Sequence, residues 1–113
     1  MIFEKSIAEV ITIREAPALD PITVYLQDFS GRGRITIECW GKCWTTFFGA
    51  YGDGTLSKFV SDCNMSYLLN RFLPTNLGVK AMKQESAYLE RILRAVQETF
   101  KQVPGDSSTQ KEE

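Results

Sequence analysis

The sequence contains no histidine. Histidine is the most common general base, the usual partner of a nucleophilic serine or cysteine, and the most common metal ligand in proteins. Its absence argues against the usual catalytic and metal-dependent chemistry. The remaining acid/base candidates, Glu38 and Asp53, have no evident partner in the sequence. We therefore expect a protein that is not an enzyme and that uses no cofactor.

Cysteine is scarce and its count is odd, with Cys39, Cys43 and Cys63 in the chain. An odd number of cysteines in a cytosolic chain argues against a disulfide framework. Cys39 and Cys43 have a C-x₃-C spacing, but a closed thiolate site needs about four cysteine or histidine ligands. The sequence therefore predicts ordinary packing for these side chains rather than a metal site.

Long apolar runs and an excess of one charge are also missing. No apolar stretch approaches the ~20 residues of a membrane span. Residues 1–5 lack the basic-then-apolar order of a signal peptide. The net charge of −1 argues against a duplex-DNA binder, which needs clustered lysine and arginine to neutralise phosphates. We expect a cytoplasmic protein that does not associate with membranes.

The chain has 113 residues, of which 43% are hydrophobic and 24% are charged. This composition suits one globular domain that buries about two-thirds of its unfolded surface. We expect that domain to be an α+β unit over residues 1–103. The polar composition of residues 104–113 predicts a disordered tail.

Apolar residues alternate with polar ones through the first half of the chain, as they do in half-buried strands. This alternation predicts a strand within Glu4 to Arg14 and a second near Ile22 to Phe29. Residues 34–48 then predict a β-hairpin. Gly41-Lys42 suits its turn, because a two-residue type II′ turn has glycine at the first central position.

The predicted hairpin register sorts its side chains onto two faces of the sheet. The mostly apolar face carries Ile35, Ile37, Cys39, Trp44, Thr46 and Phe48. The mixed face carries Thr36, Glu38, Trp40, Cys43, Thr45 and Phe47. The two closely spaced cysteines therefore point in opposite directions, so they could neither share a metal ion nor bond to each other.

Helical spacing replaces this alternation after residue 55. Two runs of apolar residues at i, i+3, i+4 and i+7 predict two short helices, jointed near Asn64 and ended by Pro74. A longer apolar stripe predicts a helix from about Val79 to Gln102. The whole chain predicts an antiparallel β-meander of three to four strands, followed by two short helices and one long C-terminal helix packed on one face of the sheet.

Residues 49–55, Gly-Ala-Tyr-Gly-Asp-Gly-Thr, lie between a predicted strand and a predicted helix, where phosphate-binding loops are found. The segment lacks the Lys-Ser/Thr ending of a Walker loop, and it is not a dinucleotide fingerprint. We interpret it as a turn in which Thr55 or Asp53 caps the next helix.

Basic and aromatic residues gather around the hairpin, and six of them are the predicted partner-binding residues: Trp40, Phe47, Tyr51, Arg32, Arg34 and Lys42. Single-strand nucleic-acid binders stack bases on sheet aromatics and follow the backbone with arginine and lysine. An exposed aromatic patch more often marks a protein partner, including a second copy of the chain. A third alternative is a second layer of core under the N-terminal strand.

The segment from Pro21 to Phe72 resembles a group of small, largely uncharacterised proteins of lambdoid bacteriophages and prophages. The residues that carry the resemblance are Asp20-Pro21-Ile22-Thr23-Val24, Gly33 to Ile37 with Trp44, Gly49-Ala50-Tyr51-Gly52, Thr55-Leu56-Ser57-Lys58-Phe59, Asp62-Cys63-Asn64 and Tyr67-Leu68. The resemblance implies an accessory protein from a phage early region, located in the cytoplasm of the bacterial host. It implies binding to a host protein such as a nuclease, a recombination enzyme or a CRISPR effector, and it carries over no functional residue.

Overall fold

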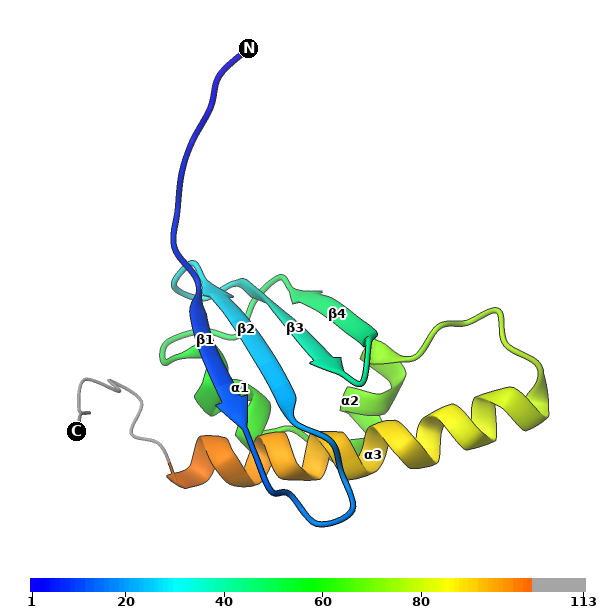
Figure 1. Cartoon of the computed structure of the whole chain (residues 1–113). Helices are drawn as coiled ribbons and strands as arrows, with labels where there is room; N and C mark the ends of the chain where they lie inside the picture. The colour runs from blue at the N-terminus through cyan, green and yellow to red at the C-terminus, as the bar shows by residue number, and fades with distance from the viewer. Residues whose placement is uncertain (103–113) are drawn as a thin grey trace.

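The computed structural model describes residues 1–102, in which four strands form one antiparallel sheet in the order β1-β2-β3-β4. The strands are β1 (Glu9–Ile13), β2 (Ile22–Asp28), β3 (Gly33–Cys39) and β4 (Lys42–Phe48). The helices that follow are α1 (Leu56–Asp62), α2 (Met65–Phe72) and α3 (Val79–Gln102). The helices lie behind the sheet in Figure 1, on one of its faces. The α+β fold predicted from the sequence is therefore confirmed.

Strand alternation places the core on the helix side of the sheet. Eight of the side chains that point there are at most 4% exposed, and they are Ile22, Val24, Leu26, Ile35, Ile37, Cys39, Trp44 and Phe48. Successive residues of a strand point to opposite faces, so the residues between them point away from the helices. Cys39 is buried and Cys43 is exposed, which confirms that the two cysteines point in opposite directions.

The predicted position of the hairpin turn is wrong by one residue. The turn residues are Trp40 and Gly41, both with positive φ (55° and 75°), which is the geometry of a type I′ turn. Cys39 therefore pairs with Lys42, and each residue of β3 faces a partner two positions from the predicted one. Because side chains alternate with a period of two, this shift leaves every strand residue on its predicted face.

The two short helices begin where their capping residues predict. Thr55 Oγ1 accepts a hydrogen bond from the Lys58 amide (3.2 Å) and caps α1. Asn64 Oδ1 accepts one from the Ser66 amide (2.8 Å) and caps α2, so the joint between the helices lies at its predicted place. α2 then ends two residues before Pro74.

Helix α3 packs against both short helices. Its buried stripe consists of the predicted residues Leu89, Ile92, Leu93, Val96 and Phe100. Gln97 Nε2 donates hydrogen bonds to the carbonyls of Val60 and Cys63 (3.0 and 2.9 Å) at the C-terminal end of α1. This amide therefore holds the joint between α1 and α2 against α3 and positions the helical layer under the sheet.

Two segments extend beyond the body of the molecule. Residues 1–8 run away from β1 as an arm, and the first turns of α3 project past β4 (Figure 1). None of the helices within residues 1–102 has the length and apolar character needed to cross a membrane. The tail predicted for residues 104–113 lies outside the described residues.

Candidate interaction surface

The face of the sheet that points away from the helices is covered by no segment of residues 1–102 (Figure 1). We call it the open face, and its residues are Val10, Thr12, Thr23, Tyr25, Gln27, Arg34, Thr36, Glu38, Cys43, Thr45 and Phe47. β1 lies at the edge of the sheet beside β2 and does not cross this face. The alternative of a second core layer under the N-terminal strand is therefore wrong.

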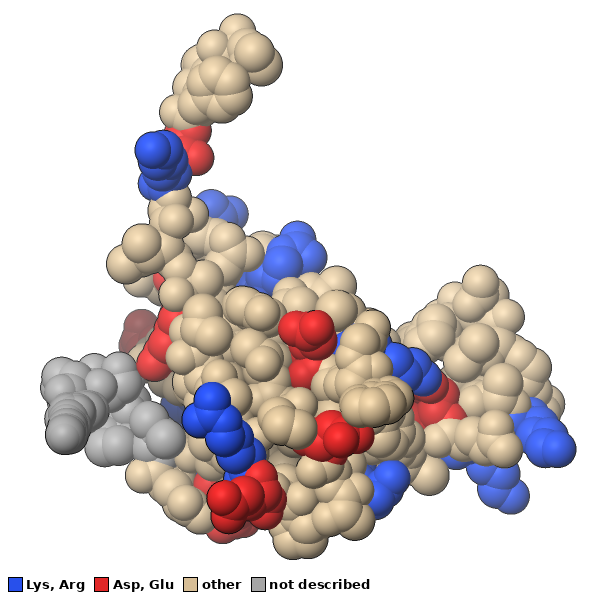
Figure 2. Space-filling model, viewed as in Figure 1, with Lys and Arg blue, Asp and Glu red and all other residues tan. Residues whose placement is uncertain are grey.

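The open face carries little charge. Arg34 and Glu38 are its charged residues, and their charges have opposite signs. Figure 2, which shows the molecule from the same side, has mostly uncharged surface over the strands. Two aromatic side chains contribute to it, since Tyr25 is 38% exposed and Phe47 is 37% exposed. A nearly neutral patch with aromatic residues resembles the central part of a protein interface.

Two of the predicted partner-binding residues lie together at one end of the open face. Arg34 and Phe47 are direct partners across β3 and β4. The guanidinium carbon of Arg34 lies 5.5 Å from the centre of the Phe47 ring, which is a cation–π contact. Arg32 lies at the same end, exposed in the turn before β3. In the next row, the hydroxyls of Thr36 and Thr45 hydrogen-bond to each other (2.9 Å).

Trp40 lies at the other end of the hairpin. It is 75% exposed at the tip of the turn. The length of β4 separates it from Phe47 by about 20 Å. The prediction that Trp40 and Phe47 share one face is wrong, because Trp40 is a turn residue rather than a strand residue. The structure thus divides the predicted basic and aromatic cluster into two parts.

Tyr51 is partly buried, and its ring and hydroxyl are held by contacts within the molecule. Its ring stacks on the Phe59 ring, with 5.4 Å between their centres. Its hydroxyl donates a hydrogen bond to Asp28, and its amide donates one to the Gly31 carbonyl (2.8 Å). Burial and the bond to Asp28 raise the pKa of this hydroxyl above its ordinary value. We therefore assign Tyr51 to the folding of the loop over residues 49–55.

The carboxylate of Asp28 connects three separate segments. It accepts hydrogen bonds from the Tyr51 hydroxyl, from the Leu56 amide at the start of α1 (2.7 Å) and from the Ser30 amide (3.1 Å). The Leu56 amide is the group that a phosphate at this loop would contact. Because a carboxylate occupies that amide, the geometry favours the interpretation of residues 49–55 as a capped turn.

Lys42 points toward the helix layer and is engaged there. Its Nζ lies 2.5 Å from Glu85 Oε1 on α3, and Trp44 Nε1 donates to Glu85 Oε2 (2.8 Å). Burial raises the pKa of Glu85, but the bonds from Lys42 and Trp44 outweigh it and hold that pKa below its ordinary value. In the predicted register Lys42 would be a turn residue, so these contacts are a physical reason for the observed turn.

We expect Glu85→Ala to lower the free energy of unfolding by about 1 to 2 kcal/mol, because Lys42 and the Trp44 indole lose their shared acceptor. Urea unfolding followed by tryptophan fluorescence measures this loss. The control is Glu90→Ala, which removes the exposed pair with Arg94 and should cost less than about 0.5 kcal/mol.

The pKa of Glu85 is depressed in the folded protein. Its contribution to stability is therefore present above the ordinary value of 4.5 and is lost as the pH falls through the folded pKa. The difference in unfolding free energy between wild type and Glu85→Ala should therefore be largest above pH 4.5 and should shrink as the pH falls below 4.5. Equal losses for Glu85→Ala and Glu90→Ala at neutral pH would contradict this assignment.

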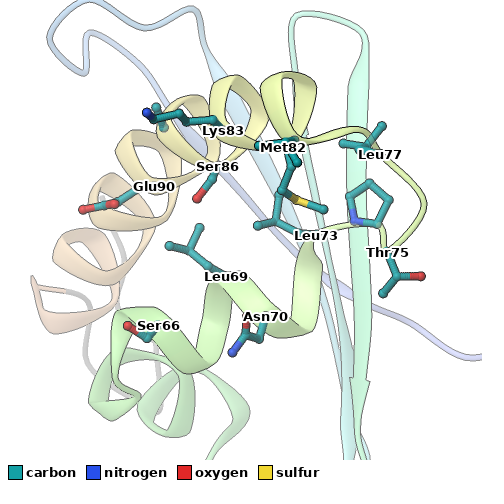
Figure 3. A pocket seen from close by; sticks show the side chains of 13 residues that line it. Ser66, Leu69, Asn70, Leu73, Thr75, Leu77, Met82, Lys83, Ser86 and Glu90 are labelled. Atoms are coloured by element: carbon teal, nitrogen blue, oxygen red, sulfur yellow. The ribbon is translucent and has the colours of Figure 1, made fainter.

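A second surface feature was not predicted from the sequence. A groove of about 1010 Å³ opens between α2, the loop that follows it and the first turns of α3. Leu69, Leu73 and Met82 point into it, and Leu77 lies at its loop side (Figure 3). The signal in the sequence is the cluster of apolar residues around Pro74, although Pro74 by itself predicts only the end of a helix.

The described residues offer no evident place for a metal ion. Within residues 1–102, no group of three or more histidine, cysteine, aspartate or glutamate side chains lies close enough to hold one. Burial and the nearby charge of Asp62 raise the pKa of the Cys63 thiol, so this cysteine favours the protonated form.

The fold and the open face together define a small α+β protein with an uncovered antiparallel sheet. Residues 1–80 match the model of a phage protein family, so the chain belongs to that phage family. The match covers the arm, all four strands, α1 and α2. No curated protein and no solved structure matches the chain. The phage origin that the sequence resemblance implied is thereby confirmed.

Proposed function

We propose that the chain is a non-enzymatic accessory protein of a lambdoid phage or prophage, which binds a host protein through the open face. By this binding it modulates or inhibits host nucleic-acid processing or anti-phage defence, for example a nuclease or a CRISPR effector. The observation that carries the proposal is the open face itself, an uncovered sheet surface with two aromatic residues and almost no charge. Exposed patches of this kind mark protein interaction sites.

The same geometry favours a protein partner over single-stranded nucleic acid. A single-strand binder needs free cations along the backbone and free aromatic rings for the bases. Lys42 is paired with Glu85, and Arg34 lies over the ring of Phe47. The Tyr51 ring is partly buried and stacks on Phe59. Of the residues that would bind an oligonucleotide, most are engaged within the protein.

The test is affinity capture from a lysate of the bacterial host, using the tagged full chain. The double variant Tyr25→Ala/Phe47→Ala removes the aromatic side chains of the open face. Because aromatic anchors dominate most interfaces, capture of the partner should fall at least about tenfold. Thr45→Lys provides a second disruption at the centre of the face, where an exposed residue can be replaced without emptying the core.

Two controls separate this surface from the others. Val79→Ser changes a residue of the α2–α3 groove that is 90% exposed, and it should leave capture unchanged. Trp40→Ala tests the hairpin tip alone. If capture survives the open-face variants but is lost with Val79→Ser, the proposed surface is wrong. Salt-dependent binding of an oligonucleotide in a fluorescence titration would instead support the nucleic-acid alternative.

A further inference from the structure

The two edges of the sheet differ in how they are protected. At the β4 edge, α2 packs alongside the strand and Arg71 donates a hydrogen bond to the Phe47 carbonyl. At the β1 edge, no described segment pairs with the outer side of the strand. Natural edge strands usually carry lysine, proline or a bulge that prevents further pairing. β1 has the sequence Glu-Val-Ile-Thr-Ile, which contains neither lysine nor proline and has Glu9 as its one charged residue.

The arm before β1 adds exposed apolar side chains to this unpaired edge. Ile2 is 89% exposed, Phe3 is 82% exposed and Ile7 is 94% exposed. In Figure 1 the arm continues from the start of β1 and projects away from the rest of the molecule. Ile11 and Ile13 of β1 are themselves only partly buried on the helix side. A strand that paired along the outer edge of the arm and β1 would cover part of this apolar surface.

The arm and β1 are complementary to a second copy of themselves. Residues 9, 11 and 13 point to the helix side, because their partners on β2 are buried. If the arm continues this alternation, residues 3, 5 and 7 point to the same side. An antiparallel pair with its two-fold axis at Ile7 then places Phe3 opposite Ile11 of the second copy. It also places Lys5 opposite Glu9 of the second copy, and it does so twice by symmetry.

No neighbouring register achieves this match. Moving the axis to residue 6 places Phe3 opposite Glu9, and moving it to residue 8 places Lys5 opposite Ile11. An axis at Glu9 brings the two copies of that carboxylate face to face, and like charges directly opposite one another are destabilising. The charge pattern therefore selects both the partner, a second copy of this chain, and the register.

We propose that two copies associate by antiparallel pairing of residues 1–13 about a two-fold axis at Ile7. The contact is closed, since each copy uses the same surface and completes the edge of the other. It joins the two sheets into one and leaves both open faces accessible. This association uses the edge of the sheet and does not depend on the function proposed for the open face.

A charge-swap cycle on the full chain tests the pairing. Sedimentation equilibrium should find a dimer for the wild type. Lys5→Glu and Glu9→Lys should each raise the dissociation constant at least about tenfold, because each turns two attractive pairs into two repulsive ones. The double variant Lys5→Glu/Glu9→Lys should restore the wild-type value. Lys80→Glu and Glu98→Lys are matched controls that reverse the same charges on α3 and should have no effect.

Ile7→Asp provides a second variant, because it brings two carboxylates together at the axis and should yield a monomer. Its side chain is 94% exposed in the single chain, so the fold should not depend on it, and circular dichroism checks this. A wild type that is monomeric at about 100 µM would overturn the proposal. A dimer that is insensitive to the single charge reversals would overturn it too. Failure of the double variant to recover would overturn the register.

Discussion

Gly33→Ala is expected to lower the free energy of unfolding by about 3 kcal/mol. A Cβ on this residue would lie 2.5 Å from the Gln27 carbonyl oxygen of the neighbouring strand, which is closer than side chains approach backbone. It would also lie 3.1 Å from the Tyr51 hydroxyl and 3.2 Å from Leu56 Cδ2. The Gln27 carbonyl oxygen is a backbone atom, so it can move away only if β2 moves with it. Relieving the clash therefore distorts the sheet, whereas a flexible side chain could simply rotate away.

Gly49→Ala is the matched control for this prediction. At Gly49 the nearest atom to an added Cβ is a carbon of the Phe47 ring, at 4.0 Å, which is an ordinary contact. This substitution should change the free energy of unfolding by less than about 0.5 kcal/mol. Urea unfolding followed by tryptophan fluorescence measures both variants. Similar losses at the two positions would show that the close approach at Gly33 is not the cause.

The elements were predictable because their signals are local. The start of β2 at Ile22 and the start of α3 at Val79 are where the alternation and the helical spacing place them. Each signal depends on residues a few positions apart, and the caps Thr55 and Asn64 need only the backbone amides that follow them. The helices and strands that such local patterns predict are present in the folded protein because the tertiary packing favours the same elements.

The turn was not predictable, because the information that fixes it lies far away in the chain. Alternation sorts the faces equally well in two registers that differ by two residues. The observed one places Lys42 and Trp44 where Glu85 on α3 can bind both. It also requires a positive φ at Trp40, a residue that rarely adopts it. The observed turn therefore combines contacts between residues more than 40 positions apart with a backbone conformation at Trp40 that the conformational preference of tryptophan does not predict.

The site was predicted only in part for a similar reason. The predicted partner-binding residues include both Arg34 and Phe47, and the observed register brings these two into contact. Tyr51 was interpreted as a surface residue because its partners, Phe59 and Asp28, belong to other elements. The groove between α2 and α3 depends on the path of the loop between them, and no sequence period describes that path.

The two proposals have a joint consequence if both hold. Pairing at β1 would place two open faces on one continuous sheet, so that a dimer presents two copies of the same binding surface. A partner that contacts both would bind more tightly than one that contacts a single copy, because its second contact is intramolecular. In affinity capture, Ile7→Asp should then weaken retention of such a partner, whereas Tyr25→Ala/Phe47→Ala should remove binding itself.

Asp28→Asn is expected to lower the free energy of unfolding by about 2 kcal/mol at neutral pH, since water screens the charge of this exposed side chain and reduces the contribution of its hydrogen bonds. The carboxylate accepts hydrogen bonds from the Tyr51 hydroxyl, the Leu56 amide and the Ser30 amide, and it thereby joins the β2–β3 turn to the start of α1. An amide keeps the shape of the side chain but has only one acceptor oxygen and no charge. The loss is measured by urea unfolding.

The pH dependence gives this prediction a distinct signature. Burial raises the pKa of Asp28, but the hydrogen bonds from Tyr51, Leu56 and Ser30 outweigh it and hold that pKa below the ordinary value of 3.8. The stabilisation is therefore fully present above that value and is lost as the pH falls through the folded pKa. Wild type and Asp28→Asn should approach each other in stability under acid, and their difference should be constant from about pH 5 to pH 8.

Tyr51→Phe separates the hydrogen bond from the packing of the ring, since it keeps the stack on Phe59 and removes only the hydroxyl. In a double-mutant cycle, Asp28→Asn and Tyr51→Phe should show a coupling of about 1 kcal/mol, because each removes the charge-assisted hydrogen bond between the two side chains. Additive losses would mean that the two side chains act independently. An Asp28→Asn variant with the stability and acid profile of wild type would show that the carboxylate does not hold these three segments together.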